Sequence, residues 1–274
     1  MTKPFFSVVV PTLNEADFVL RLLEDLTRQT EHGFEVILVD GKSTDGTVVK
    51  AQTFASKMPL TILTSQKKNV GWQRNLGAEA AKGQYVVFFD ADVQITPRFL
   101  KLLRRQIERT KPPFVTTYLR ADSTIVNDRI IASLFNLSIE ASLFVERPFV
   151  PGFNFIVRRD VLAKAGGFNS RIKHGEDHEL ATRLYEAGYP LTILKTPRLI
   201  FSLRRYRTEG RLAVLRKNAL ATWHVFTKGH ITQEIFEYPM GGGWYKTVKR
   251  ESVKPQVLPK VRRFVKKLVR LLLE

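Results

Sequence analysis

Apolar runs alternate with amphipathic segments along the first hundred residues of the chain. Short runs rich in Val, Ile, Leu and Phe are typical of strands buried on both faces of a parallel sheet. The segments between them have apolar residues at helical spacing and begin with polar or turn residues such as Ser43 and Thr44. This βαβ alternation predicts strands at 5–10, 34–39, 60–63 and 85–89, and helices at 16–29, 45–56 and 70–82.

After Pro97 the alternation is less regular. The pattern predicts a helix near 98–109, a strand near 114–119, a long apolar helix at 123–145 and a strand near 153–157. The glycines at 241–243 predict a mobile loop, and residues 255–259 a linker. We therefore expect an α/β fold with a Rossmann-like, mostly parallel sheet flanked by helices, a mixed C-terminal part and a terminal amphipathic helix.

Polar residues stand at the ends of three predicted strands. Asp40 closes the second strand, Asp90 and Asp92 follow the fourth, and the first strand runs into the polar segment 11–15. Parallel strands end at one edge of a sheet, where ligands bind in open α/β folds. Asp90 and Asp92 face the same side of an extended chain, and their hard oxygens suit Mg²⁺ or Mn²⁺. The sequence predicts a divalent metal site at this edge; helix caps and solvated turn residues are the alternatives.

A second acidic group opens the helix predicted to run to Glu186. The macrodipole at a helix N-terminus explains one carboxylate, but Glu176, Asp177 and Glu179 crowd this turn together with two histidines. If the turn faces the metal site, one carboxylate can act as a general base toward a hydroxyl nucleophile. Arg74, on the third helix, can direct a guanidinium to a nucleotide or its phosphates, and a structural ion pair is its alternative.

Several classes of site are excluded by the sequence. The dinucleotide-binding motif Gly-x-Gly-x-x-Gly follows none of the predicted strands. Gly41 and Gly46 have the spacing of the two glycines in a Walker loop, but the next residues are Thr47-Val48, whereas a Walker loop has Lys-Ser/Thr there. Phosphate must then be held by a metal. The chain has no cysteine, so disulfides and thiolate chemistry are excluded as well.

These segments resemble family 2 of the nucleotide-sugar glycosyltransferases, which have a GT-A fold. The resemblance covers about residues 5–190 and rests on motifs in the order of the family: SVVVPTLNE at 7–15, VDGKSTDGT at 39–47, QRNLG at 73–77, AAKG at 80–83, FDAD at 89–92, GGF at 166–168 and GED at 175–177. Each motif is short, but the ordered set is specific.

The resemblance implies that Pro11, Thr12 and Glu15 line a nucleotide pocket and that Asp40 contacts the base. Many members carry a second Asp where this chain has Gly41, so the nucleobase stays open, with UDP favoured over GDP.

The same resemblance implies that Asp90 lies near the ribose and diphosphate, that Asp92 ligates the metal and that Asp177 is the catalytic base. Asp90 is a second candidate for the metal. His224, from the C-terminal region, is considered as a third metal ligand, with a structural role as its alternative.

The net charge of +18 is concentrated near the C-terminus, because residues 195–274 hold 19 Lys and Arg against 5 Asp and Glu. Arg204 and Arg205 are candidates, with Glu176, for contact to acceptor or phosphate, and a solvated charged face is the alternative. Residues 260–273 form a basic amphipathic pattern that predicts a helix on an anionic membrane surface; docking on the domain is the alternative.

We predict a metal-dependent inverting glycosyltransferase that uses Mn²⁺ or Mg²⁺. It moves a sugar from a nucleoside-diphosphate sugar to a hydroxyl or phosphate of a membrane-presented acceptor, such as a polyprenyl phosphate or glycolipid, in cell-envelope glycan or glycolipid synthesis. Residues 1–200 are expected to form the GT-A domain, with 1–96 as nucleotide-binding half and 97–200 as acceptor-side half. Residues 201–274 are expected to form a basic, membrane-associating extension.

Two other functions are weighed against this one. A sugar-phosphate nucleotidyltransferase needs a glycine-rich basic loop after the first strand, which residues 11–15 lack. A nucleic-acid-binding protein fits the charge, but the basic tail lacks interleaved aromatic residues for stacking. We predict no signal peptide and no transmembrane helix, and hence a cytoplasmic protein on the inner face of the cell membrane.

Overall fold

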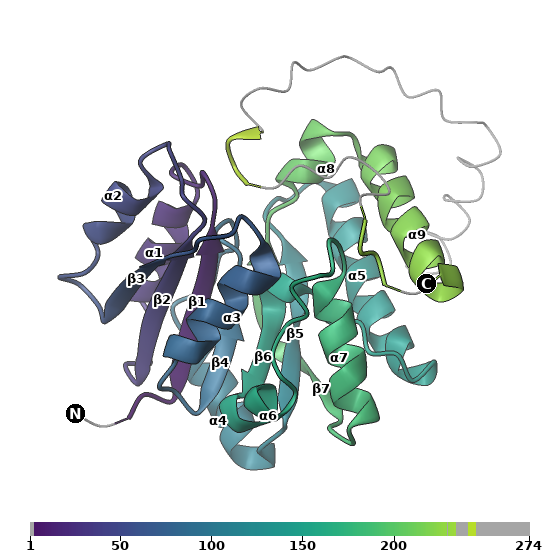
Figure 1. Ribbon diagram of the computed structural model, residues 1–274, viewed down its shortest axis with the longest axis horizontal. Coiled ribbons are helices and arrows are strands. Elements are labelled where there is room, and N and C mark those ends of the chain that lie inside the picture. Colours follow the sequence, from purple (N-terminus) through teal and green to yellow (C-terminus); the bar gives the residue numbers. More distant parts are fainter. Residues whose placement is uncertain (1–2, 229, 234–240, 245–274) are drawn as a thin grey trace.

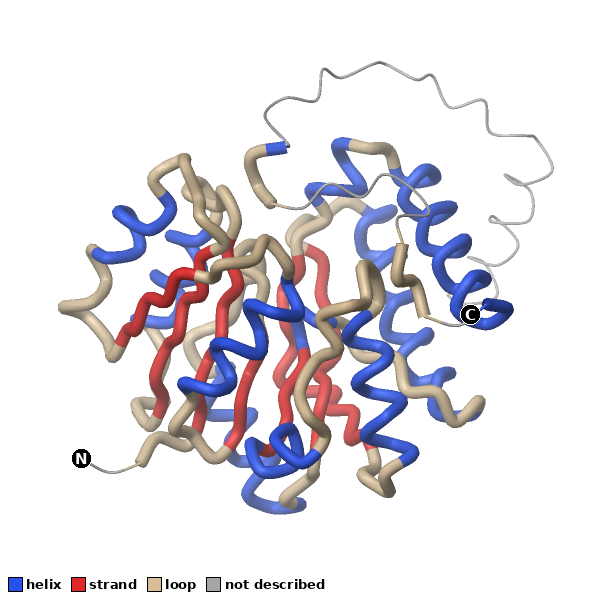
Figure 2. The backbone as a smooth tube through the Cα atoms, in the orientation of Figure 1, coloured by secondary structure: helices blue, strands red, loops and turns tan. Residues whose placement is uncertain are grey.

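A seven-stranded sheet runs through the centre of the computed structural model, which describes residues 3–228, 230–233 and 241–244 (Figures 1 and 2). The strand order is β3-β2-β1-β4-β6-β5-β7, and β6 alone runs antiparallel to its neighbours. The strands are β1 (Phe6–Thr12), β2 (Phe34–Asp40), β3 (Leu60–Thr64), β4 (Tyr85–Phe88), β5 (Phe114–Ala121), β6 (Phe155–Arg158) and β7 (Leu191–Phe201).

Helices cover both faces of this sheet. They are α1 (Val19–Thr27), α2 (Thr47–Gln52), α3 (Val70–Ala80), α4 (Phe99–Thr110), α5 (Val126–Phe144), α6 (Arg159–Lys164), α7 (Glu176–Glu186), α8 (Arg204–Thr208) and α9 (Arg211–Lys228). In Figure 1, α3, α6 and α7 cross the front of the sheet, and α8 and α9 stand beside α5.

The alternation of side chains along β1 builds two separate cores. Val8 and Val10 pack in a core with α1, α4 and α5, whereas Val9 points into a core with α6 and α7. All three valines are fully buried. A strand with helices on both faces needs apolar residues at every position, and this explains why its sequence is a continuous apolar run.

The helices begin where local chemistry favours them. The side chain of Asn69 accepts a hydrogen bond of 2.8 Å from the backbone nitrogen of Trp72 and so caps α3. Helix α7 follows Gly175, whose φ of 84° is in the left-handed region. Asn69 and Gly175 thus mark the starts of α3 and α7.

The structure confirms the predicted α/β class and every strand and helix predicted between residues 5 and 186, with small shifts at the ends. The sequence did not predict β7, which pairs in parallel with β5. This strand lies at the edge of the sheet and exposes Lys195 and Arg198, so it lacks a continuous apolar run. Helices α6, α8 and α9 were also not predicted.

The sequence led to two predictions about membranes, one on transmembrane helices and one on the amphipathic segment 260–273. Within the described residues, no helix combines the length and apolarity needed to cross a bilayer. The amphipathic segment 260–273 lies outside the described residues.

Candidate functional site

The loops that follow β1 and β2 are joined at the carboxyl edge of the sheet by Asp40. Its carboxylate accepts hydrogen bonds from the hydroxyl of Thr12, at 3.1 Å, and from the backbone nitrogen and hydroxyl of Ser43, at 2.8 and 2.5 Å. Asn14 has a φ of 52°, and its backbone nitrogen donates to the Ser43 hydroxyl. Asp40 is buried and fixes the shape of both loops.

A cavity of about 1360 Å³ opens at this edge of the sheet. One part of its wall is charged and the other is apolar, with side chains from α5 and α9. Asp40 and His224 are not part of the wall. The predicted site residues that line the cavity are Pro11, Thr12, Glu15, Arg74, Asp90, Asp92, Glu176, Asp177, Arg204 and Arg205.

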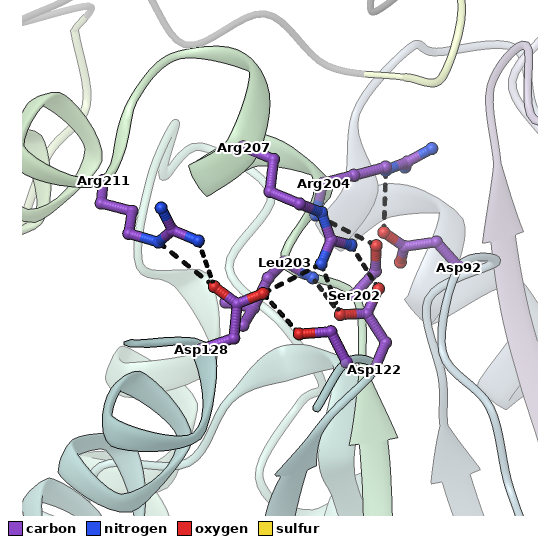
Figure 3. A network of polar contacts seen from close by, with 9 residues as sticks. Asp92, Asp122, Asp128, Ser202, Leu203, Arg204, Arg207 and Arg211 are labelled. Carbon is purple, nitrogen blue, oxygen red and sulfur yellow. Dashed lines mark hydrogen bonds and ion pairs between the residues drawn. The ribbon is translucent and has the colours of Figure 1, made fainter. Parts of the chain in front are cut away.

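Arg204, the first residue of α8, bridges two carboxylates from different strand ends. Its terminal nitrogens donate to both carboxylate oxygens of Glu15 at 2.8 and 2.9 Å. Its Nε lies 2.8 Å from Oδ2 of Asp92 (Figure 3). The guanidinium also lies over the ring of Phe18, with Cζ 4.2 Å from the ring centroid. The end of β1, the end of β4 and α8 therefore meet at one cation.

Burial changes the acidity of both carboxylates. Burial raises the pKa of Glu15 to about 7, although Arg204 acts in the opposite direction. Burial also raises the pKa of Asp92, again against the charge of Arg204. Both carboxylates are therefore costly to ionise unless a cation stays beside them.

A second arginine organises the opposite side of the charged wall. Arg74 is buried, and its Nη1 and Nη2 donate to Glu176 at 2.6 Å and to Asp90 at 3.1 Å. Burial and the charge of Asp177 raise the pKa of Glu176 to about 7, while Arg74 lowers it. Arg74 thus links α3, the segment after β4 and the first turn of α7.

Asp177 is held by backbone amides. Its Oδ2 accepts a hydrogen bond of 2.6 Å from the backbone nitrogen of Gly152, and its Oδ1 accepts one of 2.9 Å from that of His178. Burial alone would raise its pKa, but the charges of His178 and Arg74 together with these amides lower the pKa below its ordinary value. The carboxylate is therefore ionised and fixed in orientation at neutral pH.

Gly152 was not identified from the sequence. A Cβ atom at this position would lie 2.6 Å from Nη1 of Arg74, so the missing side chain lets the guanidinium reach Glu176. Since the amide of the same residue binds Asp177, Gly152 holds two of the site side chains in place. The dipeptide Pro151-Gly152 before a strand was the available signal.

A buried aspartate anchors α8 and α9 to α5. Asp128 is fully buried and accepts hydrogen bonds from Ser123 and Arg211, both at 2.6 Å, and from Arg207 at 3.2 Å (Figure 3). Arg207 also binds both oxygens of Asp122, at 2.5 and 2.9 Å. This network fixes the helix that begins with Arg204.

The predicted three-ligand metal set with His224 is not formed. Among the described residues, no three His, Asp or Glu side chains come together in a way that could hold a metal ion. His224 is carried by α9, which packs against α8, and it takes no part in the cavity wall. The candidate ligands that remain at the cavity are Asp92 and Asp90.

Comparison with known proteins identifies the family. The sequence profile of glycosyl transferase family 2 matches residues 7–166. Over 207 residues the chain is 30% identical to the glycosyltransferase AglE of Haloferax volcanii. This alignment covers 70% of this chain and 64% of AglE. It is 25% identical over 250 residues to the amylovoran biosynthesis glycosyltransferase AmsB of Erwinia amylovora, covering 85% of this chain and 81% of AmsB. The chain therefore spans about two thirds of AglE and four fifths of AmsB.

Solved structures share the fold. A mannosyltransferase from Pyrobaculum calidifontis in complex with GDP-Man and Mn²⁺ aligns with a TM-score of 0.63 and 21% identity, covering 81% of this chain and 65% of the other. The TarS 1–349 fragment of S. aureus in complex with UDP aligns with a TM-score of 0.59 and 22% identity, covering 72% and 60%. These two structures confirm the GT-A fold. The two alternative functions are not retained because the family profile and the curated relatives are glycosyltransferases. The protein belongs to glycosyl transferase family 2.

Proposed function

We propose that this chain is a metal-dependent inverting glycosyltransferase that moves a sugar from a nucleoside-diphosphate sugar to a membrane-presented acceptor. The observation that carries this proposal is the cavity whose wall holds Glu15, Asp92 and Arg204 together with the ionised Asp177. An anionic donor needs cations beside its phosphates, and an acceptor hydroxyl needs a base. One cavity offers both.

The nucleotide is proposed to lie against the ends of β1 and β2. Pro11, Thr12 and Glu15 form the wall there, and the buried Asp40 holds the loops in shape behind them. Asp40 was our candidate for contact with the base, but it lies behind this wall, so we propose that it acts on the base through Thr12, whose hydroxyl it binds. UDP is the expected nucleoside diphosphate, and TarS has been solved with UDP; GDP is second because the Pyrobaculum enzyme was solved with GDP-Man.

The donor set fits a hard divalent cation. Asp92 offers carboxylate oxygens in the wall and Asp90 is its neighbour there, while phosphate and water oxygens usually complete the shell of Mg²⁺ or Mn²⁺ on so few protein ligands. Bound there, the ion would neutralise charge that develops on the departing diphosphate. The Pyrobaculum structure, which contains Mn²⁺, supports this proposal.

Asp177 is the proposed general base. Its two backbone hydrogen bonds fix the carboxylate, and its lowered pKa keeps it ready to accept a proton from the acceptor hydroxyl. The acceptor hydroxyl, activated by this base, attacks the face of the sugar opposite the leaving diphosphate. Such an attack inverts the anomeric centre. Arg74 and Arg204 keep the surrounding carboxylates paired, and Arg204, Arg205 and Glu176 remain our candidates for contact with acceptor or donor phosphate.

The acceptor is proposed to be lipid-linked, such as a polyprenyl phosphate or glycolipid in cell-envelope glycan or glycolipid synthesis. The apolar part of the cavity wall supports a hydrocarbon segment in the acceptor; it includes Ile131, Leu134, Phe135, Phe149, Phe153 and Val214. We keep residues 1–200 as the GT-A domain and 201–274 as an extension that adds Arg204 and Arg205 to the cavity wall and binds the inner face of the membrane. Flotation with anionic and neutral vesicles tests this part, since binding to neither would contradict it.

A thermal-unfolding panel tests the donor site. UDP, GDP, CDP and dTDP are added to the protein with and without Mn²⁺. We expect one nucleoside diphosphate to raise the unfolding temperature only when Mn²⁺ is present, because a ligand at ~100 times its Kd stabilises a protein by about 2.7 kcal/mol. Asp92→Asn should lose the Mn²⁺-dependent shift, whereas Asp160→Asn, at an exposed position, should keep it. The absence of any shift in the wild type would overturn the proposal.

A further inference from the structure

Residues 241–244 lie directly on the loop that follows β1. The backbone nitrogen of Gly242 donates a hydrogen bond of 3.1 Å to the carbonyl oxygen of Leu13. Gly242 is buried, and Gly241 is part of the cavity wall together with Leu13 and Glu15. We call residues 241–244 the C-terminal strap. The sequence predicted only a loop here.

The contact between strap and loop is too close for side chains. A Cβ atom at Gly241 would lie 2.4 Å from the carbonyl oxygen of Leu13, and φ of 86° at this residue is also unfavourable for other residues. A Cβ atom at Gly242 would lie 2.5 Å from the carbonyl oxygen of Asn14 and 2.6 Å from Oε2 of Glu15. The close approach therefore requires glycine at both positions.

The third glycine is different. A Cβ atom at Gly243 would have the Cβ of Asn14 as its nearest neighbour, at 3.3 Å, so a shift of a few tenths of an ångström makes room for it. The strap continues into Trp244, whose ring lies 5.9 Å from Cζ of Arg205. The strap thus connects the loop after β1 with α8, the same two elements that the pair of Glu15 and Arg204 connects.

We propose that the C-terminal strap is a wall of the donor site that binding of the nucleoside diphosphate requires, and this rests on the proposed function. By covering the carboxylate of Glu15, the strap keeps water from the pair of Glu15 and Arg204. The hydrogen bond from Gly242 to Leu13 holds the loop after β1 in the shape that the donor meets. The strap contributes position and exclusion of water, and its residues take no part in bond making.

The test compares two additions of one methyl group. The affinity for the nucleoside diphosphate that stabilises the wild type is measured by calorimetry in the presence of Mn²⁺. Gly242→Ala should weaken binding by about tenfold or more, and Gly243→Ala by less than about threefold, since only the first collides with backbone and with Glu15. Donor KM should rise in Gly242→Ala more than kcat falls.

Trp244→Ala serves as the second variant, because it removes the ring beside Arg205 and introduces no collision. It should weaken nucleotide binding by about threefold to tenfold, and it decides the question if Gly242→Ala does not fold. If Gly242→Ala folds and binds as tightly as the wild type or more tightly, the proposed role of the strap is overturned and the proposed function is not. If Gly242→Ala does not fold, the same result with Trp244→Ala overturns that role. A wild type that binds no nucleoside diphosphate overturns the proposed function itself.

Discussion

Nε of Arg204 lies 2.8 Å from Oδ2 of Asp92, so a fixed cation of the chain stands beside the proposed metal ligand (Figure 3). The other nitrogens of the same guanidinium bind Glu15. A planar guanidinium can serve two carboxylates at once, whereas a lysine ammonium is a point charge without this geometry. Arg204 is therefore central to the stability of the charged wall.

Arg204→Gln should destabilise the fold, because it leaves Glu15 and Asp92 largely buried without their cation. Removal of one partner of a buried pair costs about 3–5 kcal/mol of unfolding free energy. Arg204→Lys should lie between this variant and the wild type. Denaturant unfolding measures the differences. Arg158→Gln is the matched control, since Arg158 pairs with an exposed Asp160 and such pairs contribute about 0–1 kcal/mol. Equal losses in the two Gln variants would contradict this assignment.

Asp177→Asn should remove the proposed base while it retains the fold. The amide oxygen of Asn can still accept the hydrogen bond from Gly152, but it cannot accept a proton from the acceptor. Loss of general-base catalysis reduces kcat by roughly 10²–10⁴-fold. Product formation and nucleotide affinity are measured together, and the affinity should stay close to that of the wild type. A folded variant with wild-type turnover would exclude Asp177 from the reaction.

Gly152→Ala should disturb Arg74 and Asp177 at once. The new methyl group would lie 2.6 Å from Nη1 of Arg74, which must then leave Glu176. We expect kcat/KM to fall by about tenfold or more. Gly71→Ala is the matched control. Gly71 lies in α3, and a methyl group there would have no neighbouring atom closer than 3.4 Å. Because alanine restricts the unfolded chain more than glycine does, this control should be more stable than the wild type by about 0.4–1 kcal/mol. Unchanged kcat/KM in Gly152→Ala would refute the positioning role.

Asp128→Asn should destabilise the protein in a pH-dependent way. Burial raises the pKa of Asp128, but the hydrogen bonds from Ser123 and Arg211 outweigh it and lower the pKa below its ordinary value of 3.8. The unfolded chain then takes up the proton first as the pH falls. The stabilisation is complete above about pH 5 and is lost as the pH drops through the lower folded pKa.

Unfolding free energies at pH 7 and below pH 3 test this prediction. Asp128→Asn should lose about 3 kcal/mol at pH 7, and the difference from the wild type should shrink in acid. Asp160→Asn makes the same chemical change in an exposed pair and should cost about 0–1 kcal/mol. A difference at Asp128 that does not change with pH would show that its charge is not the stabilising property.

The sequence by itself determined the βαβ half and the edge at which the site lies. A strand such as β1 is buried on both faces, so its apolar run is visible without any knowledge of its partners. Parallel strands end at one edge, and for this reason Glu15, Asp40 and Asp92 could be placed near each other from their positions at or after the ends of β1, β2 and β4. The acidic first turn of α7 was equally visible.

Only the tertiary structure decided how the charges pair and what covers them. Arg204 is 189 residues from Glu15 in the sequence, and Arg74 is 102 residues from Glu176. No local periodicity records such pairs, because they depend on how α8 and α7 pack against the sheet. The role of Gly152 and the contact of Gly242 with Glu15 likewise depend on space that distant segments leave. Local patterns determine elements and their ends, whereas the packing of distant elements determines which side chains share a cation.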